Sequence, residues 1–129
     1  MSRHNSRHRG LLFVVQEEFD KALEGEEEVK ITFSKKAGGK RTIPIWFTVK
    51  GRTLELLPMY GLKTKWYGDV EAAGSLELKV RGQVKVASPR IVRDPEAIEE
   101  IKQRFGVKYG EDEVRKYYTT QNVALEILL

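Results

Sequence analysis

The sequence predicts a mainly β domain of the α+β class, a small barrel of six antiparallel strands with three or four short helices. Most segments alternate apolar and polar residues with period two, and short glycine-containing turns join them, which favours pairing between neighbours in the chain. The other segments carry apolar residues at helical spacing. A chain of 129 residues with 40% hydrophobic and 33% charged residues has the size and composition of one globular domain.

A helix is expected first, over residues 11–24. Its apolar residues recur at spacings that place them on one helical face. They are Leu11, Val15, Phe19, Ala22 and Leu23. Gly25 is positioned to end this helix, and three glutamates then form an acidic connector.

Three strands are expected next, over residues 29–34, 40–50 and 53–57. Their apolar residues alternate with polar ones, as in strands with one solvated face. The turn at 35–39 contains two successive glycines, which can adopt positive φ. Pro44 cannot donate a ladder hydrogen bond, so the second strand should lie at an edge or contain a bend.

The second half of the chain is expected to contain three further helices and three further strands. Thr64 is predicted to cap a short helix that stops near Gly74. Asp94 and Pro95 are a helix start, and that helix is expected to end at Gly106. A shorter helix follows through Val114 and Tyr118. The remaining strands are expected over residues 76–80, 84–91 and 123–129.

Residues 1–10 are expected to be a flexible basic tail, and residues 11–129 a single domain. The tail contains three arginines and no acid, so it carries three of the four net positive charges and leaves the body nearly neutral. Both histidines, His4 and His8, lie in the tail, and the chain has no cysteine. The usual zinc sites and catalytic triads therefore have no donors in the body, and no metal site is expected. No apolar run reaches the about 18 residues of a membrane span, and the short apolar stretch at 11–15 is followed at once by polar and acidic residues, unlike a secretory signal. A cytoplasmic protein is therefore expected.

Two segments contain the informative chemistry. The hairpin at residues 34–41 gathers four cations on a glycine-containing turn: Lys35, Lys36, Lys40 and Arg41. Such a cluster can hold phosphate or carboxylate groups, or it can be a solvated hairpin tip. Residues 59–67 place aromatic and cationic side chains beside a helix N-terminus, which favours an anion. Trp66 and Tyr67 can equally be core residues, and neither segment contains a nucleophile flanked by a base.

Residues 31–47 resemble the signature Thr-Thr-x-Gly-Arg-Lys-Ser-Gly-x-Pro-Arg-x-x-Pro of the deazaflavin-dependent nitroreductases. Residues 56–58 and 64–67 resemble that family's next strand and its Trp-Tyr helix start. The order and spacing match across residues 11–129. The sequence departs from the signature at four hairpin positions, where Ser34, Lys35, Ala37 and Lys40 replace Gly, Arg, Ser and Pro. The family's C-terminal tyrosine cluster is only partly present.

The resemblance implies a split β-barrel like that of FMN-binding proteins, with a deazaflavin coenzyme of the F-420 type. By correspondence, Lys36 and Arg41 contact its phosphate, and Lys35 and Lys40 belong to the same basic hairpin. Trp46 and Trp66 fall at the positions that flank the ring, and Gly61 at the loop that approaches it. Tyr118 occupies the position that closes over the substrate, which makes it the candidate catalytic residue.

The expected function is that of a deazaflavin-dependent oxidoreductase, like a nitroreductase or quinone reductase, which transfers hydride to a small organic acceptor. FMN is the alternative cofactor, because the same barrel serves both. A nucleic-acid-binding barrel without catalysis is a further alternative, disfavoured by the nearly neutral body. A cofactor-free barrel with a binding role also stays open. A homodimer is compatible with the sequence, since Ile43, Ile45 and Phe47 suit either a core or a subunit contact.

Overall fold

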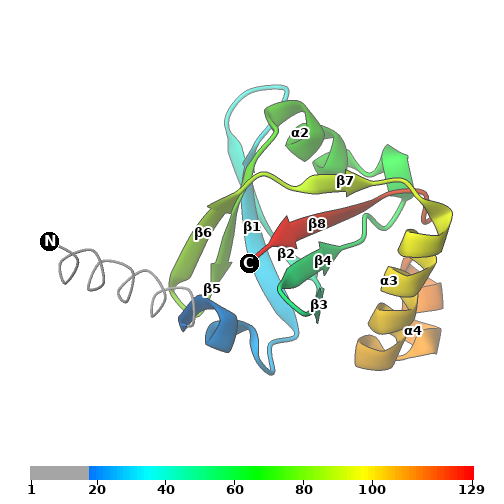
Figure 1. Cartoon of the computed structure of the whole chain (residues 1–129). Helices are drawn as coiled ribbons and strands as arrows, with labels where there is room; N and C mark the ends of the chain where they lie inside the picture. Colours follow the sequence, from blue (N-terminus) through cyan, green and yellow to red (C-terminus); the bar gives the residue numbers. More distant parts are fainter. Residues whose placement is uncertain (1–17) are drawn as a thin grey trace, which may run out of the picture.

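The computed structural model describes residues 18–129 and consists of two four-stranded antiparallel sheets with helices around them (Figure 1). One sheet has the order β2-β1-β5-β6, and its strands are β1 (Glu28–Ser34), β2 (Lys40–Trp46), β5 (Leu76–Val80) and β6 (Gln83–Ala87). The other has the order β3-β4-β8-β7, and its strands are β3 (Thr48–Lys50), β4 (Thr53–Leu56), β7 (Arg90–Val92) and β8 (Ala124–Leu128). The mainly β, antiparallel architecture is therefore confirmed.

The predicted count of six strands is wrong, because two expected strands each break into two. The strand expected over 40–50 is interrupted at Phe47, and the one expected over 84–91 is interrupted at residues 88–89. In both cases the two halves pair in different sheets, β2 and β6 in one sheet and β3 and β7 in the other. The chain thus turns a corner at both edges of the sandwich, as strands that switch sheets do. Apolar alternation continues through such corners, so the sequence shows one long strand.

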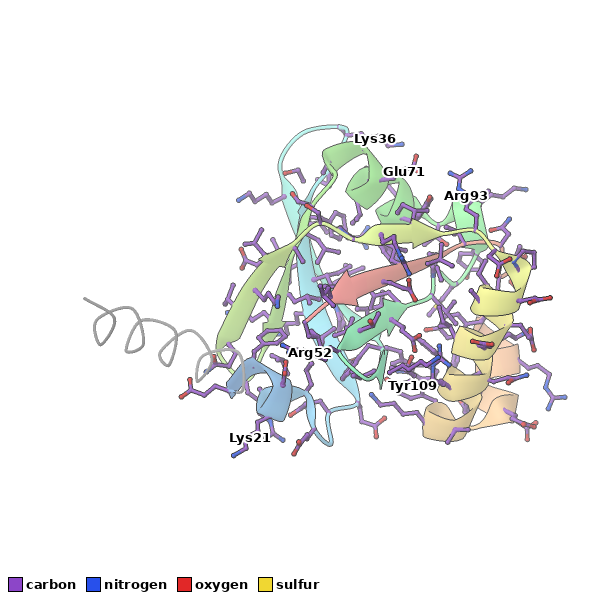
Figure 2. All side chains as sticks on the ribbon, in the orientation of Figure 1. Lys21, Lys36, Arg52, Glu71, Arg93 and Tyr109 are labelled. Carbon is purple, nitrogen blue, oxygen red and sulfur yellow. The ribbon has the colours of Figure 1, made fainter. Side chains whose placement is uncertain are left out.

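The corner at Phe47 is held by the end of helix α3 (Pro95–Tyr109) (Figure 2). The backbone N–H of Phe47 donates to the Tyr109 hydroxyl oxygen at 3.0 Å. The same hydroxyl is a donor to two carbonyl oxygens, that of Glu27 at 2.6 Å and that of Phe47 at 2.9 Å. The Lys108 ammonium also donates to the Phe47 carbonyl, at 2.9 Å. The backbone groups that leave the ladder at this corner are therefore satisfied by side chains.

The helices at the carboxyl end pack as a pair beside the second sheet (Figure 1). Asp94 caps α3 as predicted, accepting from Ala97 N at 3.0 Å. The helix does not end at Gly106 but continues to Tyr109. The missing side chain at Gly106 instead gives room to α4 (Glu111–Tyr117), because a Cβ there would lie 3.3 Å from Glu111 Cγ.

A buried ion pair ties α3 to the second sheet. Glu55 of β4 is 1% exposed, and both of its carboxylate oxygens accept from the Arg104 guanidinium of α3. Thr48 of β3 donates to the same carboxylate at 2.8 Å. The carboxylate has donors on several sides, which is the condition for burying a charge in a core.

The short helix α2 (Lys65–Ala73) covers one end of the first sheet, next to the β1–β2 hairpin (Figure 1). Buried Asp69 of α2 accepts from the backbone N of Lys36 at 3.1 Å, which fastens the hairpin to the helix. Thr64 occupies the N-cap position as predicted. Its side chain makes no capping bond to the helix, however, and accepts instead from Tyr60 N at 2.9 Å.

The helix expected over residues 11–24 is described only from residue 18. Residues 18–23 are helical, and Gly25 follows with φ +74°, as predicted for a helix end. The basic tail, with His4 and His8, lies outside the described residues. Ile45 and Phe47 are buried in the main core and Ile43 packs against it, so all three contribute to the interior of this chain.

Candidate functional site

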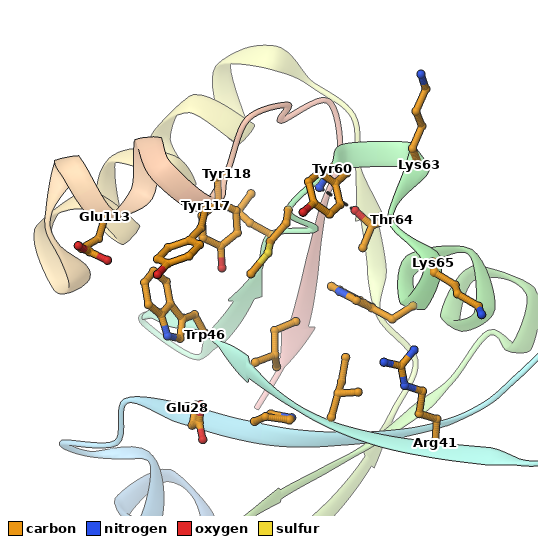
Figure 3. A pocket seen from close by; sticks show the side chains of 16 residues that line it. Glu28, Arg41, Trp46, Tyr60, Lys63, Thr64, Lys65, Glu113, Tyr117 and Tyr118 are labelled. Carbon is orange, nitrogen blue, oxygen red and sulfur yellow. Dashed lines mark hydrogen bonds between the residues drawn. The ribbon is translucent and has the colours of Figure 1, made fainter.

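A pocket of about 710 Å³ opens between β2, the loop before α2 and helix α4 (Figure 3). This volume is in the range of ligand and cofactor sites. The lining residues come from β1, β2, the segment 57–66 and α4 with the residue after it. They are Glu28, Arg41, Ile43, Pro44, Ile45, Trp46, Leu57, Met59, Tyr60, Lys63, Thr64, Lys65, Trp66, Glu113, Tyr117 and Tyr118.

One end of the pocket, the basic end, is formed by Arg41, Lys63 and Lys65 (Figure 3). None of these three forms an ion pair within residues 18–129. The start of α2 lies at the same end, and its first N–H groups have no partner within the helix and no side-chain cap. Free cations and free backbone donors at one place make this end suitable for a phosphate or carboxylate.

Aromatic residues form the opposite wall of the pocket. The Trp46 indole stacks on Tyr109 with ring centroids 4.1 Å apart and an interplanar angle of 4°. Tyr117 meets the indole edge-on at 5.8 Å, and Tyr118 lies 6.0 Å away. Trp66 borders the pocket from the other side and is 9% exposed. The stacking fixes the orientation of Trp46, so the pocket has a rigid apolar wall.

Tyr118 is the least exposed of the polar residues that line the pocket, at 3%. Its hydroxyl points into the pocket and makes no hydrogen bond within the described part of the chain (Figure 3). Burial raises the pKa of Tyr118 well above its usual range, with a smaller contribution from Tyr109. The hydroxyl therefore stays protonated at neutral pH and is available as a hydrogen-bond donor.

Two carboxylates, Glu28 and Glu113, lie at the end of the pocket opposite the basic end, which we call the acidic end (Figure 3). Glu28 is the cross-strand partner of Trp46 in the β1–β2 register, so the two side chains share a face of the sheet. Glu113 lies four residues before Tyr117 in α4, on the same face of that helix. The pocket is thus polarised along its length.

The structure brings together four of the residues that the sequence predicted for the site. Arg41, Trp46, Trp66 and Tyr118 all line the pocket. Lys35, Lys36, Lys40 and Gly61 do not line it. Lys40 borders a separate hollow on the outer face of the first sheet, since alternation along β2 turns it away from Arg41.

The other three predicted residues make local contacts. The Lys36 ammonium lies against Gly68 of α2, 3.2 Å from where a Cβ would be, and the Lys35 side chain folds back toward Gly39. Gly61 is buried with φ +58°, and a Cβ there would lie 2.1 Å from Asn122 Oδ1. The closest contacts of Gly61 are therefore with the loop at 120–122.

Three lining residues, Glu28, Glu113 and Tyr117, were not predicted from the sequence. Glu28 reads as part of an acidic connector, and the signal that could have found it is its register opposite Trp46. Glu113 and Tyr117 have a helical spacing of four, but such pairs are common on solvated helix faces. Only the packing of α4 against α3, with Val114 and Tyr118 in the buried cluster under the two helices, places them at the pocket.

The described residues show neither a membrane-spanning helix nor a metal cluster. No helix in residues 18–129 is long and apolar enough to cross a membrane. Within the same residues, no group of three or more His, Cys, Asp or Glu side chains is placed to hold a metal ion.

Several solved structures share this fold at low sequence identity. An F420-H2 dependent reductase (FDR-A) superposes with a TM-score of 0.61 at 18% identity, covering 79% of this chain and 94% of that one. A protein described as a domain-swapped dimer has a TM-score of 0.61 at 17% identity, with 90% and 98% covered. An FMN-binding protein from Syntrophomonas wolfei subsp. wolfei has a TM-score of 0.63 at 12% identity, with 99% and 94% covered. At these identities the likeness establishes the fold, that of FMN-binding split barrels.

The family is established by a different comparison. No curated protein sequence matches the chain significantly. A family model does match, over residues 20–127, which includes every residue of the pocket and all of both sheets except the last residue of β8. Its description is "Uncharacterized protein conserved in bacteria". The chain, a split barrel with a polarised pocket, therefore belongs to the DUF2255 family.

Proposed function

We propose that the protein binds a deazaflavin coenzyme of the F-420 type and reduces a small organic acceptor with it. The observation that carries the proposal is the pocket of about 710 Å³, in which unpaired cations and a helix N-terminus lie at one end and stacked aromatic side chains form the wall. An elongated coenzyme with an anionic tail and a planar ring is complementary to this pocket in charge and in shape.

Arg41 and the start of α2 would hold the phosphate of the coenzyme. Arg41 lies opposite Phe33 in the β1–β2 register, on the face of the first sheet that points to the interior. It lines the pocket together with Thr64, Lys65 and Trp66. A guanidinium and backbone N–H groups directed at one place bind a phosphate with charge-assisted hydrogen bonds, each worth about 1.5–3 kcal/mol.

Trp46 and Trp66 would confine the ring, and Tyr118 would orient the acceptor. The bound coenzyme supplies a hydride, and the protein supplies position and electrostatics. Because its pKa is raised, the Tyr118 hydroxyl donates a hydrogen bond to an acceptor without giving up its proton. The apolar walls from Ile43, Leu57 and Met59 exclude water from the space between ring and acceptor.

FMN is the second candidate for the same pocket. Its phosphate would be held at the basic end, and its three-ring system would lie against the aromatic wall. The fold is shared with an FMN-binding protein as well as with an F420-H2 dependent reductase. The two coenzymes differ in their absorption spectra, so the protein as purified and after incubation with each distinguishes them.

The structure predicts that Arg41 and Lys40 differ in their effect on coenzyme binding, although they are neighbours in the hairpin. Arg41→Ala should weaken binding about ten- to a hundredfold, the loss of one charge-assisted contact. Lys40→Ala removes the same charge from the opposite face of β2 and should change affinity less than about threefold. Isothermal titration with oxidised deazaflavin and with FMN measures both effects.

Equal losses for the two variants would show that general charge, rather than the pocket, governs binding. No saturable heat with either coenzyme on the unaltered protein would refute the proposal. If single-stranded oligonucleotide binds instead, with steep salt dependence, the nucleic-acid alternative is favoured.

We also propose that the protein forms a homodimer. A structure with the same fold is described as a domain-swapped dimer, which supports pairing of such chains. Ile45 and Phe47 are buried within the chain, so an interface would have to use other residues. Val84 and Val86 of β6 are 53% and 69% exposed and offer apolar surface for this purpose.

A further inference from the structure

The acidic end of the pocket has a chemical character that coenzyme binding does not explain. Glu28 and Glu113 line it, and neither forms an ion pair within residues 18–129. The lining cations, Arg41, Lys63 and Lys65, are all at the basic end (Figure 3). A phosphate-bearing tail is attracted to the basic end and repelled from the acidic one, which leaves the acidic end for the second molecule of the reaction.

The aromatic residues of this end present electron-rich surface. One face of the Trp46 indole is covered by Tyr109, and its remaining exposed surface lines the pocket with Tyr117. Ring faces attract cations, and two nearby carboxylates strengthen that attraction. One cation already lies outside the pocket on this cluster, because the Lys116 ammonium is 5.3 Å from the centroid of the Tyr117 ring.

Tyr118 provides an independent indication that a ligand enters here. Its side chain is 97% buried, and its hydroxyl points into the pocket without a hydrogen-bond partner in the described residues (Figure 3). The enclosed, unpartnered side-chain atoms of the described residues are Asp20 Oδ1 and Gln121 Nε2, so the Tyr118 hydroxyl oxygen is open to the pocket and can donate to a ligand there. The hydroxyl lies between the acidic end and the middle of the pocket, where an acceptor would meet a bound ring.

We propose that the acceptor recognised at the acidic end is a planar organic cation, an iminium or an N-alkylated heteroaromatic ring. The inference rests on the proposed function, which places the coenzyme's anionic tail at the basic end. Glu28 and Glu113 hold the positive charge, Tyr117 contacts the acceptor ring, and the Tyr118 hydroxyl borders the reacting carbon.

A cationic acceptor also needs no general acid for its reduction. At the acceptor's C=N⁺ carbon a C–H bond forms with the hydride, and the π electron pair moves to nitrogen, which becomes neutral. A reduced deazaflavin or flavin held in the pocket would supply the two electrons as hydride from one ring C–H or N–H bond, and its remaining proton would go to solvent. The acceptor itself takes up no proton. Tyr118 therefore does not have to supply one, which agrees with burial raising the pKa of its hydroxyl and making it a weaker acid.

The test compares three bicyclic probes of the same shape on the full chain without coenzyme. They are 1-methylquinolinium, the neutral 1-methylnaphthalene and the anionic 1-naphthoate. Isothermal titration should show the cation binding at least about tenfold more tightly than either of the others. Equal or tighter binding of the neutral or anionic probe would overturn the inference.

A pair of double variants tests whether the acidic end is responsible for the preference for the cationic probe. Glu28→Gln with Glu113→Gln should weaken binding of 1-methylquinolinium about tenfold and leave 1-methylnaphthalene within about twofold, since two carboxylates are lost from the site. Glu24→Gln with Glu99→Gln changes the net charge equally on exposed positions outside the pocket and should leave the cation within about twofold. Equal weakening by both double variants would refute the assignment of the acidic end.

The same proteins separate this inference from the proposed function. Coenzyme affinity should fall in Arg41→Ala and not in the Glu28/Glu113 double variant, and affinity for the cation should show the reverse. Failure of the coenzyme to bind while the cation binds refutes the proposed function only. Coenzyme binding with no preference for the cation refutes only the inference about the acceptor.

Discussion

At Gly61 a single missing side chain joins two loops next to the pocket. The backbone has φ +58°, and Asn122 Oδ1 occupies the position that a Cβ would approach to 2.1 Å. Asn122 accepts from the backbone N of Leu62 at 2.9 Å through the same atom. Gly61 therefore permits a contact that fixes the segment 59–63, from which Met59, Tyr60 and Lys63 line the pocket.

Gly61→Ala should destabilise the protein more than Gly74→Ala. Both glycines have positive φ, so each alanine should cost about 1 kcal/mol in backbone strain. At Gly74 a Cβ has no atom within 4 Å, whereas at Gly61 it displaces Asn122 and breaks the bond to Leu62. The free energy of unfolding in urea should fall by about 2–3 kcal/mol for Gly61→Ala. Equal losses would mean that Asn122 moves aside without cost.

Arg41 and Lys40 are neighbours in β2, and the alternation of the strand decides which of them lines the pocket. Adjacent residues of a strand point to opposite faces, so two cations next to each other in the hairpin have different surroundings. Arg41 lines the pocket, and Lys40 borders a hollow on the outer surface of the sheet with Thr32 and Ser34. Of the four cations of the hairpin, Arg41 therefore lines the pocket, and Lys35, Lys36 and Lys40 do not.

At the scale of elements, the corner between β2 and β3 connects the fold to the pocket. Trp46 is the last residue of β2, and Phe47 makes the turn into the second sheet. The Tyr109 side chain serves both residues, because its ring stacks on Trp46 and its hydroxyl bonds the backbone of Phe47. The position of the indole in the pocket therefore depends on helix α3.

Tyr109→Phe should destabilise the protein by about 1–3 kcal/mol, because the N–H of Phe47 loses its acceptor while the ring stack remains. Burial raises the pKa of Tyr109 to about 12. The folded state thus holds the proton more tightly than the unfolded state, so this contribution is complete below about pH 10 and is lost as the pH rises toward 12. Urea unfolding at pH 8 to 11 should show a smaller fall in stability for Tyr109→Phe than for the unaltered protein.

Tyr117→Phe is the matched control for this effect. Tyr117 is 39% exposed, touches the same indole edge-on, and its hydroxyl makes no hydrogen bond within residues 18–129. Loss of the Tyr117 hydroxyl should change the free energy of unfolding at pH 8 by no more than about 0.5 kcal/mol. It should also leave the decrease in that free energy between pH 8 and 11 unchanged within the same margin. A parallel decline for Tyr109→Phe and the unaltered protein would contradict the role assigned to the Tyr109 hydroxyl.

For the whole molecule, the second sheet joins two groups of buried side chains. The main core between the sheets includes Val123, Leu125 and Ile127, and the cluster under α3 and α4 includes Ala124. Alternation along β8 thus gives one strand to both groups. The Glu55–Arg104 pair provides a second connection between sheet and helix. We therefore expect the described domain to unfold as one unit.

The two tryptophans test this cooperativity, because Trp66 belongs to the main core and Trp46 packs against the helix cluster. In Trp46→Phe and Trp66→Phe, fluorescence reports from one group at a time. Within each variant, the urea transition by fluorescence should coincide with that by far-ultraviolet circular dichroism. A fluorescence transition of Trp46 at lower urea than the loss of secondary structure would show that α3 and α4 separate first.

The order and type of the elements were predictable from the sequence, because period two and period 3.6 are local properties of the chain. The strands β1, β4, β5 and β8, the cap at Asp94 and the start of α2 at Lys65 were all expected close to their observed places. Arg41, Trp46, Trp66 and Tyr118 were expected at one site, through the resemblance to a known family, and they line one pocket.

Only the tertiary structure decided where strands change sheets and which polar residues reach the pocket. The corner at Phe47 has no local signal, since its hydrogen-bond partners Lys108 and Tyr109 are about 60 residues away in the chain. The same holds for Glu113, which reaches the pocket because α4 packs against α3 beside the second sheet. Local pattern determines what each segment is, and long-range packing determines what it faces.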